Sequence, residues 1–262
     1  MKNHKEAFSR SLRYVYLVFV FIMGLVTIIA SGGRGSDDDN DSNGTSYDIS
    51  GYIQKGPFIS GSSVTIYELD SDLNQTGVSY QTQTIDDFGS FEFPDRVNSD
   101  YVEIISTGFY FNEVEGALSS ATLTLSSISK VTAGSNIFVN VLTCLASNRI
   151  RYLVQNENKS FENAQSQAES ELLAIFNINE TDILNFDQMN ISEEGKSNAI
   201  LLAVSAILQG SNTVPELTEL ISKISLDIEE DGTLDNSSYK EEITNNSMTL
   251  ILGKIRTNLE NR

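Results

Sequence analysis

The sequence has little of the residue types on which most enzyme active sites depend. Its 262 residues include one cysteine, Cys144, one histidine, His4, and no tryptophan. A single cysteine excludes a disulfide within the chain and a metal site built from thiolates. Because the lone imidazole lies in the first few residues, the rest of the chain has none to serve as a general base, a zinc ligand or the partner of a serine or cysteine nucleophile.

Basic side chains are also scarce. The chain carries 17 Lys and Arg against 36 Asp and Glu, a formal charge of −19. Without residues 1–32, 13 basic and 35 acidic side chains remain. Nucleic acid binding requires clustered Lys and Arg, so this charge argues against nucleic acid as a partner. The length is sufficient for two ordinary domains and a targeting segment.

Residues 1–32 have the pattern of an export signal. Four basic side chains in residues 1–13 precede an apolar run over residues 14–30, which is typical of a secretory signal peptide. The run is slightly long for a cleaved signal and slightly short for a membrane span, so both a signal peptide and an uncleaved N-terminal membrane anchor remain open. In either case we expect the domains in the periplasm or on the outer face of the inner membrane.

The same segment is similar to a lipoprotein signal, with Ser31 at the position of the lipidated cysteine. A hydroxyl cannot form the thioether, so acylation is not expected there. Residues 33–46 are mostly Asp, Asn, Gly and Ser, which predicts an acidic, flexible linker.

Residues 47–115 alternate between apolar and polar side chains over short runs that are separated by Gly, Asp and Asn. Val64 and Ile66 alternate with polar neighbours, and Phe91 and Phe93 flank a glutamate. A period of two with frequent turn residues predicts a β-sandwich.

The glycines and apolar residues of this region have a further regular spacing. The positions that carry it are Gly51, Ile53, Gly61, Val64, Ile66, Thr84, Asp87, Gly89, Phe91, Phe93, Tyr101, Glu103, Ile104, Gly108 and Phe109. In this spacing the region, about a quarter of the chain, resembles the carboxypeptidase-regulatory-like, transthyretin-like modules. The resemblance implies a seven-stranded sandwich that carries no catalytic residue and serves as a spacer, a stabiliser or a carbohydrate- or protein-facing module.

Beyond this region the period of the pattern changes. We interpret residues 116–135 as an extended connection with one or two strands in its Ser- and Thr-rich part. From residue 136 apolar residues recur at three- and four-residue steps, which predicts an all-α helical bundle over residues 136–262. The predicted helices cover residues 136–155, 161–175, 192–210, 215–228 and 238–261.

The sequence thus predicts an α+β fold of two domains, a transthyretin-like β-sandwich followed by an all-α helical bundle. In its order of signal, sandwich and helices, and in the stretches 140–145 and 227–235, the chain also resembles a group of uncharacterised bacterial envelope proteins of lipoprotein-like type. That resemblance implies location and architecture only.

One acidic stretch has the spacing of a calcium-binding loop. The candidate metal ligands, at loop positions one, three, five and nine, are Asp227, Glu229, Asp231 and Asp235. Position twelve is Ser238, so the bidentate glutamate that closes such loops is missing. Two interpretations therefore stay open: a turn that ends a helix, and a weak calcium site. We expect no other cofactor.

The β region is rich in aromatic residues that could stack on sugars. The candidates are Tyr80, Tyr101, Phe109, Tyr110 and Phe111. Core packing is the usual role of alternating aromatics on strands. Tyr110 is the one that we expect to be exposed, because Phe109 and Phe111 would point the other way.

These observations favour an exported binding or structural module of the cell envelope over an enzyme. Its partner would be an envelope protein or a polysaccharide. The alternative is a carboxylate- or calcium-dependent envelope enzyme that acts on polysaccharide, with acidic pairs such as Asp86 and Asp87 as its catalytic groups.

Overall fold

The structure is a computed structural model that describes residues 47–262, so the predicted export segment and acidic linker lie outside it. Within these residues the fold is mixed, with ten strands and six α-helices. The strands are β1 (Tyr47–Gln54), β2 (Ser63–Leu69), β3 (Gln75–Gln83), β4 (Ser90–Val97), β5 (Tyr101–Gly108), β6 (Phe111–Asn112), β7 (Ala117–Leu118), β8 (Leu123–Lys130), β9 (Ser135–Asn136) and β10 (Val139–Asn140).

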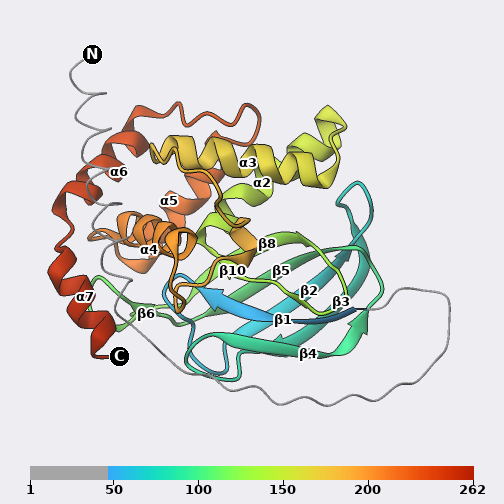
Figure 1. The fold of residues 1–262 in the computed structure, drawn as a ribbon, viewed down its shortest axis with the longest axis horizontal. Helices are drawn as coiled ribbons and strands as arrows, with labels where there is room; N and C mark the ends of the chain where they lie inside the picture. The colour runs from blue at the N-terminus through green and yellow to red at the C-terminus, as the bar shows by residue number, and fades with distance from the viewer. Residues whose placement is uncertain (1–46) are drawn as a thin grey trace.

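The strands form two main sheets and a short hairpin (Figure 1). One sheet has the order β10-β1-β4, with β9 also paired to β1, and the other has the order β3-β2-β5-β8. Val64, Ile66, Phe91 and Phe93 are all buried, which confirms the alternation read from the sequence. Since successive side chains of a strand point to opposite faces, these residues supply the core face of each sheet.

The sheets continue well past residue 115, where the sequence pattern placed the end of the β region. β8 pairs with β5 from Leu123 to Lys130, and β9 and β10 run parallel to β1. The predicted connection and the first residues of the predicted bundle are therefore partly strand. Their partners lie far away in the sequence, and a local pattern does not reveal such pairing.

The helices follow the strands and pack on them. They are α2 (Val141–Glu157), α3 (Phe161–Ile175), α4 (Lys196–Gln209), α5 (Val214–Asp227), α6 (Ser237–Thr249) and α7 (Leu252–Glu260), with a short 3₁₀ turn, η2, at Phe186–Gln188. α2 contacts both β8 and the helices α3 and α5 (Figure 1). Buried apolar side chains from strands and helices form one continuous core, so the expected division into two domains is not confirmed.

Three of the predicted helices differ clearly from the structure. The helix expected from residue 136 begins at Val141, because Asn136 belongs to β9 and residues 139–140 form β10. The helix expected from residue 192 begins at Lys196, because Gly195 before it has a φ of +132° that a helix cannot contain. The helix expected over residues 238–261 is two helices, α6 and α7, separated by extended backbone at Leu250 and Ile251.

Asn140 links the strands to the helices. It ends β10, and its buried side-chain oxygen accepts hydrogen bonds from the backbone N–H groups of Leu142 (2.9 Å) and Thr143 (3.0 Å), which caps α2. Its amide nitrogen donates to the carbonyl oxygen of Phe186 at 2.8 Å. The Asn140 side chain thus pairs with two N–H groups at the start of α2 and with a carbonyl oxygen of η2. All of these groups are buried, where unpaired polar groups are costly.

This arrangement predicts a large effect of Asn140→Ala. The substitution removes two capping bonds and the bond to the Phe186 carbonyl, which keeps only a longer bond of 3.3 Å from the N–H of Met189. The free energy of unfolding should therefore fall by about 2–3 kcal/mol. Ser160→Ala is the matched control, because Ser160 caps α3 at an exposed position and should cost about 1 kcal/mol or less. Urea unfolding measures both; equal losses would contradict a bridging role for Asn140.

Candidate functional site

The acidic stretch 227–235 forms the turn between α5 and α6. The Oδ2 atom of Asp227 accepts hydrogen bonds from the backbone N–H groups of Asp235 (2.6 Å) and Asn236 (3.2 Å). Asp231 Oδ1 accepts from the N–H of Thr233 at 2.8 Å. Two of the four candidate ligands therefore hold the turn's own backbone. This geometry is what the helix-ending interpretation requires.

The same turn is attached to the helices by a buried arginine. Arg149 of α2 donates to the carbonyl oxygens of Glu229 (3.3 Å) and Glu230 (2.6 Å) and makes a two-pronged contact with the carboxylate of Glu171 at 2.8 and 3.1 Å. The hydrogen bond to Glu171 raises the pKa of the Arg149 guanidinium. A fixed positive charge thus lies against the turn where a calcium site would need only oxygens. In the described residues no group of three or more His, Cys, Asp or Glu is placed to hold a metal ion.

Tyr110 is not exposed, and the expectation that it would be the exposed aromatic is wrong. Its side chain is fully buried, and its hydroxyl donates to Gln209 Oε1 of α4 at 2.8 Å. Burial, together with the nearby negative charge of Glu113, raises the pKa of that hydroxyl. Residues 109–111 do alternate between two faces, as the sequence predicts. The inward face is the one of Tyr110, because helix α4 covers it.

Three loops of this region that are bonded to one another carry exposed apolar side chains. Phe109 is 38% exposed, Phe88 is 50% exposed and Ile85 is 57% exposed. The guanidinium of Arg262 lies over the rings of Phe111 (4.6 Å to the centroid) and Phe88 (5.8 Å), so both rings contact the same cation. We call the surface of Ile85, Phe88, Phe109 and Phe111 the aromatic edge.

Backbone contacts fix the three loops of the aromatic edge. Ile59 N–H donates to the carbonyl oxygen of Phe109, and Gly61 N–H donates to that of Thr84. The turn that carries Phe88 is held by Asp86, whose Oδ1 accepts from the N–H groups of Phe88 and Ser90. These bonds pre-form the surface. The C-terminal end of α7 lies beside it, next to β6 (Figure 1).

Tyr80 and Tyr101 pack on other aromatic rings. Tyr80 lies 4.9 Å from Phe93, and Tyr101 lies 5.2 Å from Phe161, in both cases between ring centroids. Both tyrosines are half-buried against the core. Neither is part of the aromatic edge.

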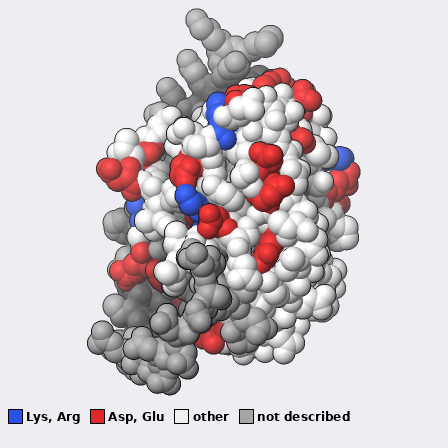
Figure 2. Space-filling view, turned by 90° about the vertical axis from the view of Figure 1, so that its right-hand side faces the viewer, with Lys and Arg blue, Asp and Glu red and all other residues white. Residues whose placement is uncertain are grey.

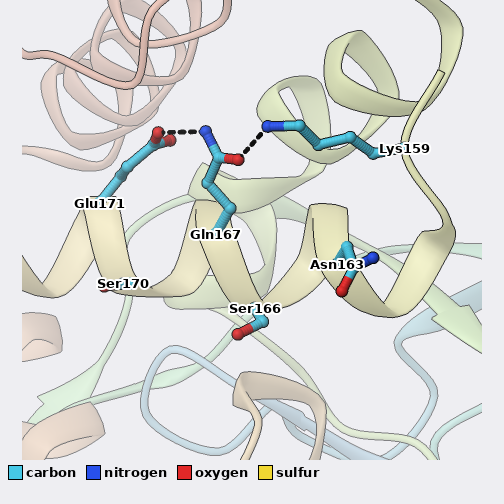
Figure 3. A pocket seen from close by; sticks show the side chains of 6 residues that line it. All are labelled: Lys159, Asn163, Ser166, Gln167, Ser170 and Glu171. Carbon is cyan, nitrogen blue, oxygen red and sulfur yellow. Dashed lines mark hydrogen bonds between the residues drawn. The ribbon is translucent and has the colours of Figure 1, made fainter. Parts of the chain in front are cut away.

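An open polar groove of about 540 Å³ runs along the outer side of α3 (Figure 3). In it Lys159 contacts Gln167, and Gln167 donates to Glu171 Oε1 at 2.7 Å. The groove contains no aromatic side chain and is lined by Lys159, Asn163, Ser166, Gln167, Ser170 and Glu171. Three of its lining groups, Lys159, Gln167 and Glu171, already bond to one another and, through Glu171, to Arg149.

Two carboxyl groups lie together where α3 meets η2. The sequence pattern did not indicate this pair. Glu169 Oε1 accepts from the backbone N–H of Phe186 at 2.9 Å. Burial, helped by the charge of Asp187, raises the pKa of Glu169 to about 8. Burial also raises the pKa of Asp187, one of whose oxygens has no hydrogen-bond partner. The pair joins α3 to η2, and spacing alone gave no signal because the two residues belong to separate segments.

Comparisons with known proteins give no relative. No family model, no curated protein and no solved structure matches the chain. Over residues 47–262 no helix is long and apolar enough to cross a membrane. The function is therefore inferred from the sequence and the geometry.

The raised pKa of Glu169 predicts a pH-dependent stability. Between about pH 4.5, the ordinary value, and about pH 8 the folded state holds a proton that the unfolded chain releases, so stability should fall as pH rises through this window. Glu169→Gln keeps a neutral acceptor for Phe186 and should flatten that decline. Urea unfolding at several pH values measures this decline in the free energy of unfolding. Glu162→Gln, an exposed position on the same helix, should leave the decline in place; an unchanged decline in Glu169→Gln would contradict the assignment.

Proposed function

We propose that this protein is an exported, non-catalytic module of the cell envelope that binds polysaccharide through its aromatic edge. The observation that carries the proposal is the exposure of Phe88, Phe109 and Ile85 on loops that backbone hydrogen bonds hold together. Exposed apolar surface of this kind costs solubility and marks contact sites. Aromatic rings present a flat apolar face that suits the C–H face of a sugar ring.

We further propose that the β region is a transthyretin-like sandwich that carries this surface, with the helices as its support. The support for it is the two-sheet arrangement and the glycine spacing described above. Gly51 and Gly89 lie where an added Cβ would collide with the carbonyl oxygens of Ile137 and Ile53. Their spacing in the sequence therefore reflects close backbone packing.

The buried ionisable groups favour a structural over a catalytic role for the rest of the molecule. Arg149 joins α2 and α3 to the 227–235 turn, and Glu169 joins α3 to η2. Each connects elements of the fold. On the face drawn in Figure 2, acidic side chains are scattered and outnumber basic ones, which suits an uncharged polymer better than a polyanion.

The aromatic edge can be tested by co-sedimentation with insoluble polysaccharide from bacterial cell walls. Phe88→Ser with Phe109→Ser should weaken binding about tenfold or more, since each removes a central aromatic contact. Leu184→Ser with Leu226→Ser, two exposed apolar positions on other elements, is the matched control and should bind like the parent. Equal binding by all three proteins would refute the proposal, as would release of soluble sugar, which would favour the enzyme alternative.

Export can be tested separately by fractionating cells that express the full chain with a C-terminal tag. We expect the protein in the periplasm or on the outer face of the inner membrane, because of the basic segment and the apolar run at residues 14–30. N-terminal sequencing then distinguishes a cleaved signal from an anchor. Replacing Leu17 and Leu25 with Arg interrupts the apolar run and should retain the chain in the cytosol; cytosolic location of the unmodified chain would contradict the proposal.

A further inference from the structure

A lysine and a glutamate from distant parts of the chain are buried together. Lys55 follows β1 directly, and Glu113 follows β6. Lys55 Nζ lies 2.7 Å from Glu113 Oε1, and their side chains are 0% and 1% exposed. Charged side chains are almost never buried this completely, because their loss of hydration is costly.

The groups around this pair leave one carboxylate oxygen without a partner. Ser205 of α4 donates to Glu113 Oε1 at 3.0 Å and also contacts the carbonyl oxygen of Lys55. The ring of Tyr110 closes the other side, with its centroid 5.2 Å from Lys55 Nζ. Glu113 Oε2 is buried and accepts no hydrogen bond. A carboxylate that remained ionised here would carry an unsatisfied oxygen in a place that excludes water.

The backbone brings the two side chains this close through Gly56. A Cβ at Gly56 would collide with the carbonyl oxygen of Phe111 and lie 3.1 Å from Glu113 Oε2. Only a residue without a side chain fits there. The close approach of the amine and the carboxyl group is therefore built into the backbone and does not depend on flexible side chains alone.

Burial shifts Lys55 towards the uncharged amine. Burial lowers the pKa of Lys55, although the charge and hydrogen bond of Glu113 oppose that shift. Transfer of one proton along the short Nζ to Oε1 contact turns the ion pair into a neutral amine and a neutral carboxylic acid. A neutral amine is a nucleophile, and the adjacent carboxyl carbon is its nearest electrophile.

We propose that Lys55 and Glu113 are joined by an amide bond between Nζ and the side-chain carboxyl carbon in the mature protein. Nζ attacks that carbon, the negative charge develops on Oε2, and the C–Oε1 bond breaks while the Ser205 hydroxyl donates to the departing Oε1. Oε1 leaves as water with the proton already transferred from the ammonium and a second proton from the amine, and Oε2 becomes the amide oxygen. No oxidant or cofactor is required, because an ammonium and a carboxylate give one amide and one water.

Such a bond would link the end of β1 to the β6 segment covalently. The chain has one cysteine and so no disulfide of its own. A cross-link between residues 55 and 113 constrains the unfolded chain as a disulfide does, and it removes two buried charges.

The test is mass spectrometry of the full chain after trypsin digestion under denaturing conditions. Lys55 lies between the trypsin sites Arg34 and Arg96, and Glu113 lies between Arg96 and Lys130. If the amide is present, trypsin cannot cleave after Lys55. The digest should then contain one branched peptide, residues 35–96 joined to residues 97–130, lighter by one water than the sum of its parts. Separate peptides 35–55, 56–96 and 97–130 of full mass would overturn the proposal.

An exposed ion pair in the same chain serves as an internal control. Lys130 and Glu162 have an even shorter contact of 2.5 Å, but their side chains are 42% and 57% exposed. Lys130 should be cleaved normally in the same digest. Glu113→Gln should still cross-link, with loss of ammonia in place of water, whereas Lys55→Met should not. Because the unmodified chain alone decides the outcome, a failure of either variant to fold does not affect the test.

Discussion

The pairing of β1 with β10 is the constraint on which the described fold depends. Ile53 pairs with Val139 and Gln54 with Asn140, in parallel, although these partners lie far apart in the chain. Gln54 also bonds through its side chain to Asn190 and to the N–H of Ile191, both at 2.8 Å. The end of β1 thus contacts both β10 and the segment at residues 190–191. Without this pairing α2 would have no fixed starting point on the sheet.

Polar groups inside the core make these long-range connections specific. Asn140 caps α2 and bonds to the turn at Phe186, and Arg149 fixes the 227–235 turn. A buried polar group without its partner costs about 1–3 kcal/mol. Alternative packings of the helices would break several such bonds at once. The apolar core provides most of the stability, and the buried polar groups select one arrangement of it.

The buried charges and the exposed rings have opposite consequences for function. The ionisable side chains at Arg149, Glu169 and Lys55 bond to elements of the fold itself, which suits roles in holding it together. The aromatic edge is different, because Phe88 and Phe109 remain exposed on loops whose backbone is already fixed. A pre-formed surface loses little conformational entropy on binding. This contrast is why the proposed function is assigned to the edge and the proposed cross-link to the interior.

The sequence by itself determined the local features of this protein. The alternation around Val64 and Phe91 predicted strands, and three- and four-residue steps predicted helices. Both follow from the period of the backbone, which is a local property. The turn at residues 227–235 was also within reach, because an acidic residue before a glycine is a local stop signal.

Only the tertiary structure decided which face of each element is covered and which distant residues meet. The period of residues 109–111 was clear, but α4 decided that Tyr110 is the inward residue and Phe109 the exposed one. Strand β8 was readable as extended, but its place beside β5 was not. Lys55 and Glu113 gave no signal, since each is an ordinary charged residue in its own segment. Contacts between residues far apart in the chain follow from the packing of the whole core, and a single sequence does not encode them as a local pattern.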